Sequence, residues 1–256
     1  MTSTETNASD GDQVLAEARA LARDYGLEEV SLRPLPEGYA NTNYALDTST
    51  GTFLYRICRQ KSKSDIADEL KVLECLKTRG FRAASPIRRD DGELISATPS
   101  GLVVLYSFIE GEEPELTPET AGEAAEALAR LHGIEPPGDF DKTNFIQIEN
   151  SQELASRFGE SIHGDRQILG RFLDETARLR DLLGDEPLPR GLIHADLFPE
   201  NTIFRENRLE AIIDFEECCV DSFLFDIGTA INLSLIHISE PTRPRLLSYA
   251  VFCLKK

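Results

Sequence analysis

The stretch from 191 to 214 places two carboxylates and one carboxamide at fixed intervals around short apolar runs. Asp196 follows one short apolar run, and Asn201 comes five residues later. A second apolar run, 211–213, leads directly into Asp214. Short apolar runs bounded by turn residues are typical of strands. The pattern therefore predicts a strand, a loop that carries Asp196 and Asn201, and a further strand that ends at Asp214.

These residue types suit the transfer of a phosphoryl group from ATP to an alcohol. That reaction needs a carboxylate that orients the hydroxyl and accepts its proton, a role that Asp196 fits. It also needs hard oxygen ligands for Mg²⁺, which Asn201 and Asp214 supply. Alternatively all three are turn residues, because Asp and Asn are common where strands end. Their joint spacing with His194 favours the site, and we expect His194 to hold the loop rather than carry protons.

The segments HADLFPENTIF and IIDFEECCVDSFLFDIG resemble the catalytic segment of the aminoglycoside phosphotransferase and choline kinase superfamily. The wording IHADLFPEN is especially similar to type II homoserine kinases. The resemblance covers residues 26–232 and implies ATP and Mg²⁺ as cofactors. It also implies an α+β, protein-kinase-like fold with a small antiparallel β-sheet lobe and a helical lobe. It further makes Asp226 a structural acceptor for the backbone of the catalytic loop, although a carboxylate near a helix N-terminus is an alternative explanation.

The first half of the chain has the alternation and turn residues of an antiparallel sheet with two helices. The helices are expected at 14–25 and at 64–78, the latter with Ser64 as its cap. Five strands complete the prediction for this half. They are 30–35, 43–48, 52–58, 93–97 and 101–108.

The segment 38–44 joins the first two strands and is a weak phosphate loop, because it has a single glycine. The resemblance to homoserine kinases implies that the amides of Asn41 and Asn43 supply donors there. It also places Arg56 where kinases carry a phosphate-binding Lys, and an Arg can fork onto phosphate oxygens. In kinases the following helix pairs a Glu with that cation, so we expect a contact between Glu69 and Arg56.

Alternatives remain for each of these nucleotide-site residues. Arg56 could be an exposed strand residue, and Glu69 a solvated surface acid, with Glu74 as the other possible partner of Arg56. After the last strand, an acidic, turn-rich segment at 110–114 is the expected lobe boundary. The resemblance implies that the hinge backbone around Phe108 holds the adenine.

These features divide the chain into a disordered tail at 1–13, a nucleotide-binding N-lobe at 14–110 and a partial C-lobe at 111–232. Within the C-lobe, a helix capped by Thr117 and opened by a proline should end at Gly133, with His132 packing against it rather than acting in catalysis. A loop is expected at 138–152 and a second helix at 165–183.

The last part of the sequence, 233–256, has a different character. LSLIHISEPTR at 233–243 resembles the translation of a transposon-type sequencing adapter, and 247–256 resembles the distal adapter followed by poly-A. We therefore expect a non-native tail there, with the natural gene continuing differently and some C-lobe helices missing. The alternative is a genuine helix and tail.

Charge and composition exclude several classes of partner. Forty-five acidic against 27 basic residues give a net charge of −18, which disfavours nucleic acid and anionic membranes. No apolar run approaches the length of a membrane span, and the polar start lacks the apolar core of a signal peptide. The five cysteines lack zinc-type spacing and suit reduced thiols. A cytoplasmic location is expected.

The sequence thus predicts a small-molecule O-kinase, a phosphotransferase with an alcohol acceptor. Homoserine is the leading substrate, and choline or ethanolamine, aminosugars and methylthioribose remain open. A nucleotide-binding pseudokinase and an inactive truncated fragment are the alternatives from other classes. A protein kinase is disfavoured, because the interval from Asp214 to Asp226 leaves no room for an activation loop.

Overall fold

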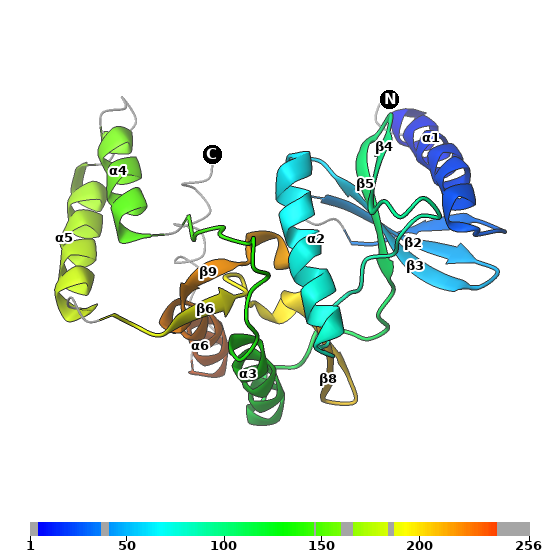
Figure 1. The fold of residues 1–256 in the computed structure, drawn as a ribbon. Helices are drawn as coiled ribbons and strands as arrows, with labels where there is room; N and C mark the ends of the chain where they lie inside the picture. Colours follow the sequence, from blue (N-terminus) through cyan, green and yellow to red (C-terminus); the bar gives the residue numbers. More distant parts are fainter. Residues whose placement is uncertain (1–4, 37–40, 146, 160–165, 184–186, 240–256) are drawn as a thin grey trace.

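The computed structural model describes residues 5–36, 41–145, 147–159, 166–183 and 187–239. Figure 1 shows a sheet-containing N-lobe, drawn in blue to green, followed by a mainly helical C-lobe. The predicted α+β arrangement is confirmed. Gly38 of the predicted phosphate loop and residues 240–256 of the predicted non-native tail lie outside the described residues.

The N-lobe contains a five-stranded antiparallel sheet with the strand order β1-β2-β3-β5-β4. Its five strands match the predicted ones to within two residues at each end. Its helices are α1 Glu5–Ala22, η1 Arg23–Tyr25 and α2 Lys63–Thr78. Its strands are β1 Ser31–Pro34, β2 Asn41–Thr48, β3 Gly51–Cys58, β4 Ile95–Thr98 and β5 Gly101–Ser107.

Successive side chains of β3 pack on opposite faces of the sheet. Tyr55 and Ile57 are buried in one cluster with α1, whereas Cys58 is buried in another cluster with α2. Because successive strand residues point to opposite faces, Arg56 lies on the α2 side of the sheet. Figure 1 shows the two helices on opposite sides of the sheet. The guanidinium of Arg56 therefore lies on the face of the sheet that α2, with Glu69, covers.

The C-lobe combines helices with short strands that carry the predicted motif. Thr117 caps its first helix through a capping box with Thr120, and Pro118 opens the helix, as predicted. The lobe's helices are α3 Pro118–His132, α4 Ile148–Gly159, α5 Arg166–Leu183, η2 Pro199–Asn201, η3 Phe215–Glu217 and α6 Phe223–Ser239. Its strands are β6 Arg190–Ile193, β7 Thr202–Arg205, β8 Arg208–Ile212 and β9 Cys219–Ser222.

Three local predictions were wrong. The first helix starts at Glu5, inside the segment 1–13 predicted as a disordered tail, and Asp12 and Gln13 there are exposed polar residues of the kind that suits the solvent side of a helix. The second helix is capped by Ser62 rather than by Ser64, because Ser62 completes a capping box with Asp65. A helix, α4, occupies residues from Ile148 onward in the predicted loop 138–152, and it packs against α5.

One buried cluster joins the two lobes. It includes Leu70 and Leu73 of α2, Leu131 of α3, Ile212 of β8 and Phe215 of η3. Burial of this apolar surface is the main stabilising term, at about 25 cal/mol for each square ångström removed from water. Because α2 shares its core with the C-lobe, the position of Glu69 is tied to that of the catalytic segment.

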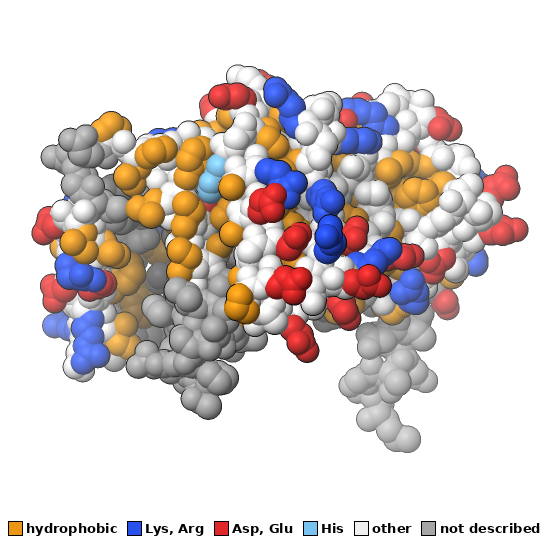
Figure 2. All heavy atoms as spheres, turned by 90° about the horizontal axis from the view of Figure 1, so that it is seen from below, with side chains coloured by type: hydrophobic (Ala, Val, Ile, Leu, Met, Phe, Trp, Pro, Cys, Tyr) orange, Lys and Arg blue, Asp and Glu red, His pale blue; other side chains and the backbone are white. Residues whose placement is uncertain are grey.

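The surface mixes charged and apolar regions. Figure 2 shows many hydrophobic side chains on the left part of the face seen from below and many charged side chains of both signs on the right part, with further charged side chains at the left edge. Leu224, Ile227 and Ile231 of α6 are between 40% and 49% exposed and lie on one face of that helix. In the described residues, no helix combines the length and the apolar character needed to cross a membrane.

Hydrogen bonds attach the hinge between the lobes, at 110–114, to the β7–β8 hairpin. Glu112 and Phe204 exchange two backbone hydrogen bonds, both of 2.9 Å. Arg205 donates to the carbonyl oxygen of Glu110 at 3.2 Å. A Cβ atom at Gly111 would overlap the side chain of Ile203 and the carbonyl oxygen of Phe204. The close approach of these two backbones therefore depends on the missing side chain.

We expect Gly111→Ala to lower the free energy of unfolding by about 2 to 3 kcal/mol, because the added methyl group must push the hinge away from β7. Urea unfolding measures the change. Gly122→Ala is the matched control, since a Cβ atom there meets nothing within 4 Å and alanine favours the helix by about 0.5 to 1 kcal/mol. Equal stability of the Gly111→Ala variant and the parent would contradict the close approach of the hinge to β7.

Candidate active site

A buried carboxylate on α6 fixes the loop that carries Asp196. Asp226 is fully buried and accepts hydrogen bonds from the backbone N–H groups of His194 and Ala195, each at 2.9 Å. Nε2 of His132 on α3 lies 2.9 Å from the same carboxylate. Ala195 has a φ of 67°, a left-handed conformation that costs a non-glycine residue about 1 to 2 kcal/mol. The two hydrogen bonds to Asp226 hold this strained turn, in the geometry that the resemblance implies.

His194 joins the catalytic loop to the strand before Asp214. Its Nδ1 accepts the N–H of Asp196 at 3.3 Å, and its Nε2 lies 2.9 Å from the carbonyl oxygen of Ile213. With Nδ1 as an acceptor, the ring proton belongs on Nε2, which donates to Ile213. The ring also meets Phe215 edge-on, with centroids 4.6 Å apart. Both nitrogens are used in structural bonds, as expected for a histidine that holds the loop.

The structure brings Asp196, Asn201 and Asp214 to neighbouring positions. Nδ2 of Asn201 donates to the Asp196 carbonyl oxygen at 2.7 Å and lies 3.3 Å from Oδ2 of the Asp196 carboxylate. The carbonyl oxygen of Asn201 accepts the N–H of Ile213 at 2.9 Å, next to Asp214. The β7–β8 pairing extends this contact, with Thr202 opposite Ile212. The loop and the hairpin therefore form one unit.

The side chains of Asn201 and Asp214 are of the types whose oxygens could hold a magnesium ion. Asp214 has a φ of 64°, and its Oδ1 is buried without a hydrogen-bond partner. A buried carboxylate oxygen without a donor is costly unless a cation compensates it. Within the described part of the chain, no three His, Cys, Asp or Glu side chains cluster as a metal site. Mg²⁺ differs from such metals, because it keeps waters and phosphate oxygens beside one or two protein ligands.

Arg56 lies between two buried carboxylates. Its Nη1 is 3.3 Å from Glu69 on α2, so the expected contact is present, and 3.5 Å from Glu216 on η3. The guanidinium also lies over the Tyr106 ring, with 5.2 Å from Cζ to the ring centroid. The alternative partner Glu74 pairs with another residue, Arg88, on the surface. Arg56 is thus a buried residue that contacts both lobes, and not an exposed strand residue.

Burial affects the protonation of Glu69 and of Arg56 differently. Burial raises the pKa of Glu69 to about 7; Arg56 opposes this shift, and the carboxylates of Glu216 and Asp214 add to it. Burial works against the charged form of Arg56, but the surrounding acidic groups hold its pKa above the usual range. The guanidinium therefore stays charged, whereas burial favours the neutral form of the Glu69 carboxyl, and burial likewise raises the pKa of Glu216.

Asn41 and Asn43 lie on β2 beside this cluster. Asn43 stands opposite Arg56 in the β2–β3 register. Nδ2 of Asn41 donates to Oε1 of Glu216. Oδ1 of both amides is buried without a hydrogen-bond partner. Both side chains therefore keep polar atoms that a ligand could satisfy.

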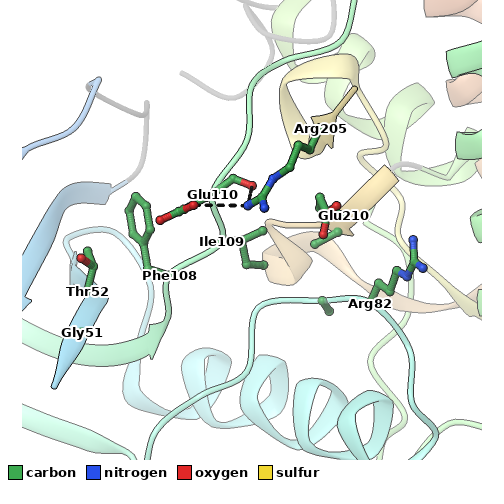
Figure 3. A pocket seen from close by; sticks show the side chains of 10 residues that line it. Gly51, Thr52, Arg82, Phe108, Ile109, Glu110, Arg205 and Glu210 are labelled. Carbon is green, nitrogen blue, oxygen red and sulfur yellow. Dashed lines mark hydrogen bonds and ion pairs between the residues drawn. The ribbon is translucent and has the colours of Figure 1, made fainter. Parts of the chain in front are cut away.

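A groove lies beside the hinge. It has a volume of about 580 Å³, and Phe108, Ile109 and Glu110 form one wall. Figure 3 shows Arg205 reaching toward Glu110 across it. Its other lining residues are Gly51, Thr52, Arg82, Ala83, Arg205, Glu210 and Ala211. Phe108 thus lies at the predicted hinge, but its groove is not lined by Arg56 or the catalytic loop.

Sequence reasoning missed two lysines, Lys142 and Lys61, that contact the turn after Asp214. Nζ of Lys142, in the segment predicted as a loop, donates to the carbonyl oxygen of Glu216 at 2.6 Å. Lys61, which follows β3, forms an ion pair of 2.8 Å with Glu217. The only signal for Glu216 in the sequence was its place in D-F-E, where kinases have D-F-G. Lys142 lies in a segment without any recognisable pattern.

We expect Asp226→Asn to lower the free energy of unfolding by about 2 to 4 kcal/mol. An amide has one acceptor oxygen, and its NH₂ group would face the N–H groups that Asp226 now accepts. Urea unfolding checks this. Asp181→Asn, at an exposed position of α5, should stay within 0.5 kcal/mol of the parent, roughly the usual range for surface changes. If the free energy of unfolding changed by a similarly small amount in both variants, the role of Asp226 in stabilising the catalytic loop would be ruled out.

Glu69→Gln should alter how stability depends on pH. The Glu69 pKa is raised from 4.5 to about 7, so the folded protein holds a proton that the unfolded chain releases. The parent therefore loses stability as pH rises from 4.5 to 7, whereas glutamine stays neutral. Relative to the parent, we expect Glu69→Gln to gain about 2 kcal/mol between pH 5 and pH 8.

Urea unfolding of both proteins at the two pH values, without nucleotide, measures this difference. Glu74→Gln is the matched control, because Glu74 lies on the same helix and pairs with Arg88 at the surface. Its difference from the parent should be the same at both pH values. A Glu69→Gln difference that does not change with pH would contradict the buried, protonating carboxyl.

Solved kinases and phosphotransferases resemble the structure. An amicoumacin kinase, hAmiN, in complex with AMP-PNP, Ca²⁺ and Ami has a TM-score of 0.64 at 16% identity, covering 94% of this chain and 74% of that one. A microcompartment-associated aminopropanol kinase has a TM-score of 0.61 at 21% identity, covering 84% of this chain and 73% of that one. These likenesses confirm the predicted kinase-like fold.

Curated homoserine kinases match by sequence. That of Rhodopseudomonas palustris strain BisA53 is 31% identical over 83% of this chain and 65% of its own length. That of Parvibaculum lavamentivorans is 28% identical over 79% of this chain and 64% of its own length. The chain thus spans a little under two thirds of these relatives. The model of the phosphotransferase enzyme family APH matches residues 31–249, so the chain belongs to this family.

Proposed function

We propose that the chain carries the nucleotide-binding lobe and the catalytic loop of an ATP- and Mg²⁺-dependent kinase for a small alcohol. The observation that carries the proposal is the joined loop and hairpin, in which Asn201 contacts Asp196 and lies beside Asp214. Membership of a phosphotransferase family supports the same reaction. Two solved structures of similar fold, one in complex with AMP-PNP and one with ADP, favour an adenine nucleotide.

Each residue of the unit has a distinct task in this proposal. Asp196 accepts a hydrogen bond from the substrate hydroxyl and takes its proton as the phosphoryl group is transferred. Asn201 fixes the Asp196 backbone, and together with Asp214 it would hold Mg²⁺. The ion, when bound, neutralises charge on the phosphates. Arg56 steadies phosphate oxygens, with Asn41 and Asn43 beside it, and the hinge backbone at Phe108 holds the adenine.

Homoserine is the substrate that we propose first, because the curated relatives are homoserine kinases. Aminopropanol is the substrate named for one solved relative, so small amino alcohols are the next group to test. Choline, ethanolamine, aminosugars and methylthioribose complete the panel. We also propose a cytoplasmic location, because ATP is supplied there and the described cysteines, 58, 75, 218 and 219, are free thiols.

A nucleotide-binding module without phosphate transfer is the second candidate. One observation favours it: the guanidinium of Arg56 is already held by Glu69 and Glu216. A guanidinium that shares its charge with two carboxylates is less available to neutralise the charge that develops during phosphoryl transfer, even where it still contacts a bound phosphate. Nucleotide binding without ADP formation from any alcohol of the panel would support this candidate.

The test is turnover by the purified chain with ATP, Mg²⁺ and each alcohol, followed by ADP release. We expect homoserine to give the highest rate. Asp196→Asn should lower kcat by about 100-fold or more without changing nucleotide affinity, because general base catalysis contributes 10²- to 10⁴-fold. Asp174→Asn, at an exposed position of α5, is the matched control with unchanged turnover. Parent-like turnover of Asp196→Asn would overturn the assignment of the base.

A further inference from the structure

Glu216 has an unusual environment for a residue that follows the metal-site aspartate by two positions. Its carboxylate is 9% exposed and contacts two side chains of the N-lobe. It accepts a hydrogen bond from Nδ2 of Asn41, and it lies 3.5 Å from Nη1 of Arg56. These partners stand on β2 and β3, the two strands next to the proposed phosphate site. One side chain of the C-lobe thus meets both strands.

The position of Glu216 is fixed from its own lobe. Lys142 donates to its carbonyl oxygen at 2.6 Å, and the N–H of Cys218 closes the turn on Phe215 at 3.1 Å. Phe215 itself is fully buried between His194 and Phe81. The carboxylate therefore projects from a turn that its own lobe fixes, and its contacts restrain the two equally buried N-lobe side chains, Asn41 and Arg56.

The two N-lobe partners keep unused polar atoms. Nε of Arg56 and Oδ1 of Asn41 are buried without hydrogen-bond partners. A buried donor or acceptor that lacks a partner costs free energy, which a ligand recovers on binding. Since Glu69 and Glu216 hold the guanidinium at Nη1, its Nε remains available to an anionic group. The second N–H of the Asn41 amide is likewise not used by Glu216.

We propose that Glu216 is a positioning residue that fixes Asn41 and Arg56 for the phosphates of the nucleotide. This inference rests on the proposed function. Glu216 preorganises the two side chains, so that nucleotide binding does not have to order them. The same contacts couple the phosphate site to the turn that follows Asp214. Glu69 holds Arg56 from the N-lobe, and Glu216 provides the matching hold from the C-lobe.

The test is the affinity for AMP-PNP at saturating Mg²⁺, measured by calorimetry on the full chain. Glu216→Ala should weaken binding about tenfold, and Glu216→Gln should weaken it less, because the glutamine oxygen can still accept from Asn41. Glu217→Gln is the matched control, since the neighbouring carboxylate pairs with Lys61 at the edge of the cleft, and it should leave the affinity unchanged.

A double-mutant cycle with Asn41→Ala separates positioning from other roles. If Glu216 acts through Asn41, Asn41→Ala combined with Glu216→Ala should bind little worse than the weaker single variant. Fully additive losses would overturn this coupling. The loss in Glu216→Ala should also persist when Mg²⁺ is raised tenfold further; a loss that disappears would identify a metal ligand instead and overturn the inference.

The outcomes distinguish this inference from the proposed function. A parent chain that does not bind AMP-PNP overturns both. A parent that binds normally, with unchanged affinity in Glu216→Ala and Glu216→Gln, overturns the positioning role alone. Circular dichroism of each variant confirms that it is folded, and Glu216→Gln keeps the test decisive if the alanine variant does not fold, because the two side chains have the same shape.

Discussion

The carboxylate of Asp226 is the group on which the rest of the site depends. It is buried, and its two oxygens accept the backbone N–H groups of two successive loop residues, of which Ala195 has a positive φ. A loop with such a backbone persists where surrounding bonds over-determine it. His132 of α3 contacts the same carboxylate and stacks on Phe223 at the start of α6. Two helices, α3 and α6, thus fix the loop that presents Asp196.

The electrostatics of the site follow from its buried acids. Glu69, Asp214 and Glu216 all act electrostatically on the guanidinium of Arg56. Neighbouring carboxylates repel one another and would also repel the phosphates of a nucleotide. A divalent cation reverses this effect, because it is the largest local charge in the site it occupies. An acidic site of this kind suits an anionic ligand that arrives together with its metal ion.

The sequence predicted the features that depend on local patterns. Alternation and turn residues indicated the five-stranded sheet, and the spacing between Asp196, Asn201 and Asp214 indicated the loop and the hairpin that bring them together. The helix α4 was missed, because residues 148–159 form a helix that packs on α5 and has weak end signals. The cap of α2 was misplaced by two residues, because two serines stand close together before the helix and local propensity does not distinguish them.

The contacts of Glu216 could not be predicted, because they join residues that are far apart in the chain. Its partners Lys142 and Asn41 are separated from it by 74 and 175 residues. No periodicity in the sequence encodes a pair at such a distance. The pairing of Arg56 with Glu69 spans 13 residues and was found by resemblance to kinases, in which the strand and the helix are neighbours. Tertiary contacts without a family precedent needed the structure.

The two layers of the N-lobe are attached to the C-lobe in different ways. The helix α2 and the strand β5 share a buried apolar cluster with α3, β8 and η3, whereas α1 packs with the other face of the sheet in a separate cluster. Apolar packing over many residues resists displacement, because separating the two surfaces exposes them to water. Movement of the N-lobe on nucleotide binding should therefore be greatest in α1 and β1, while α2, Glu69 and the catalytic loop stay together.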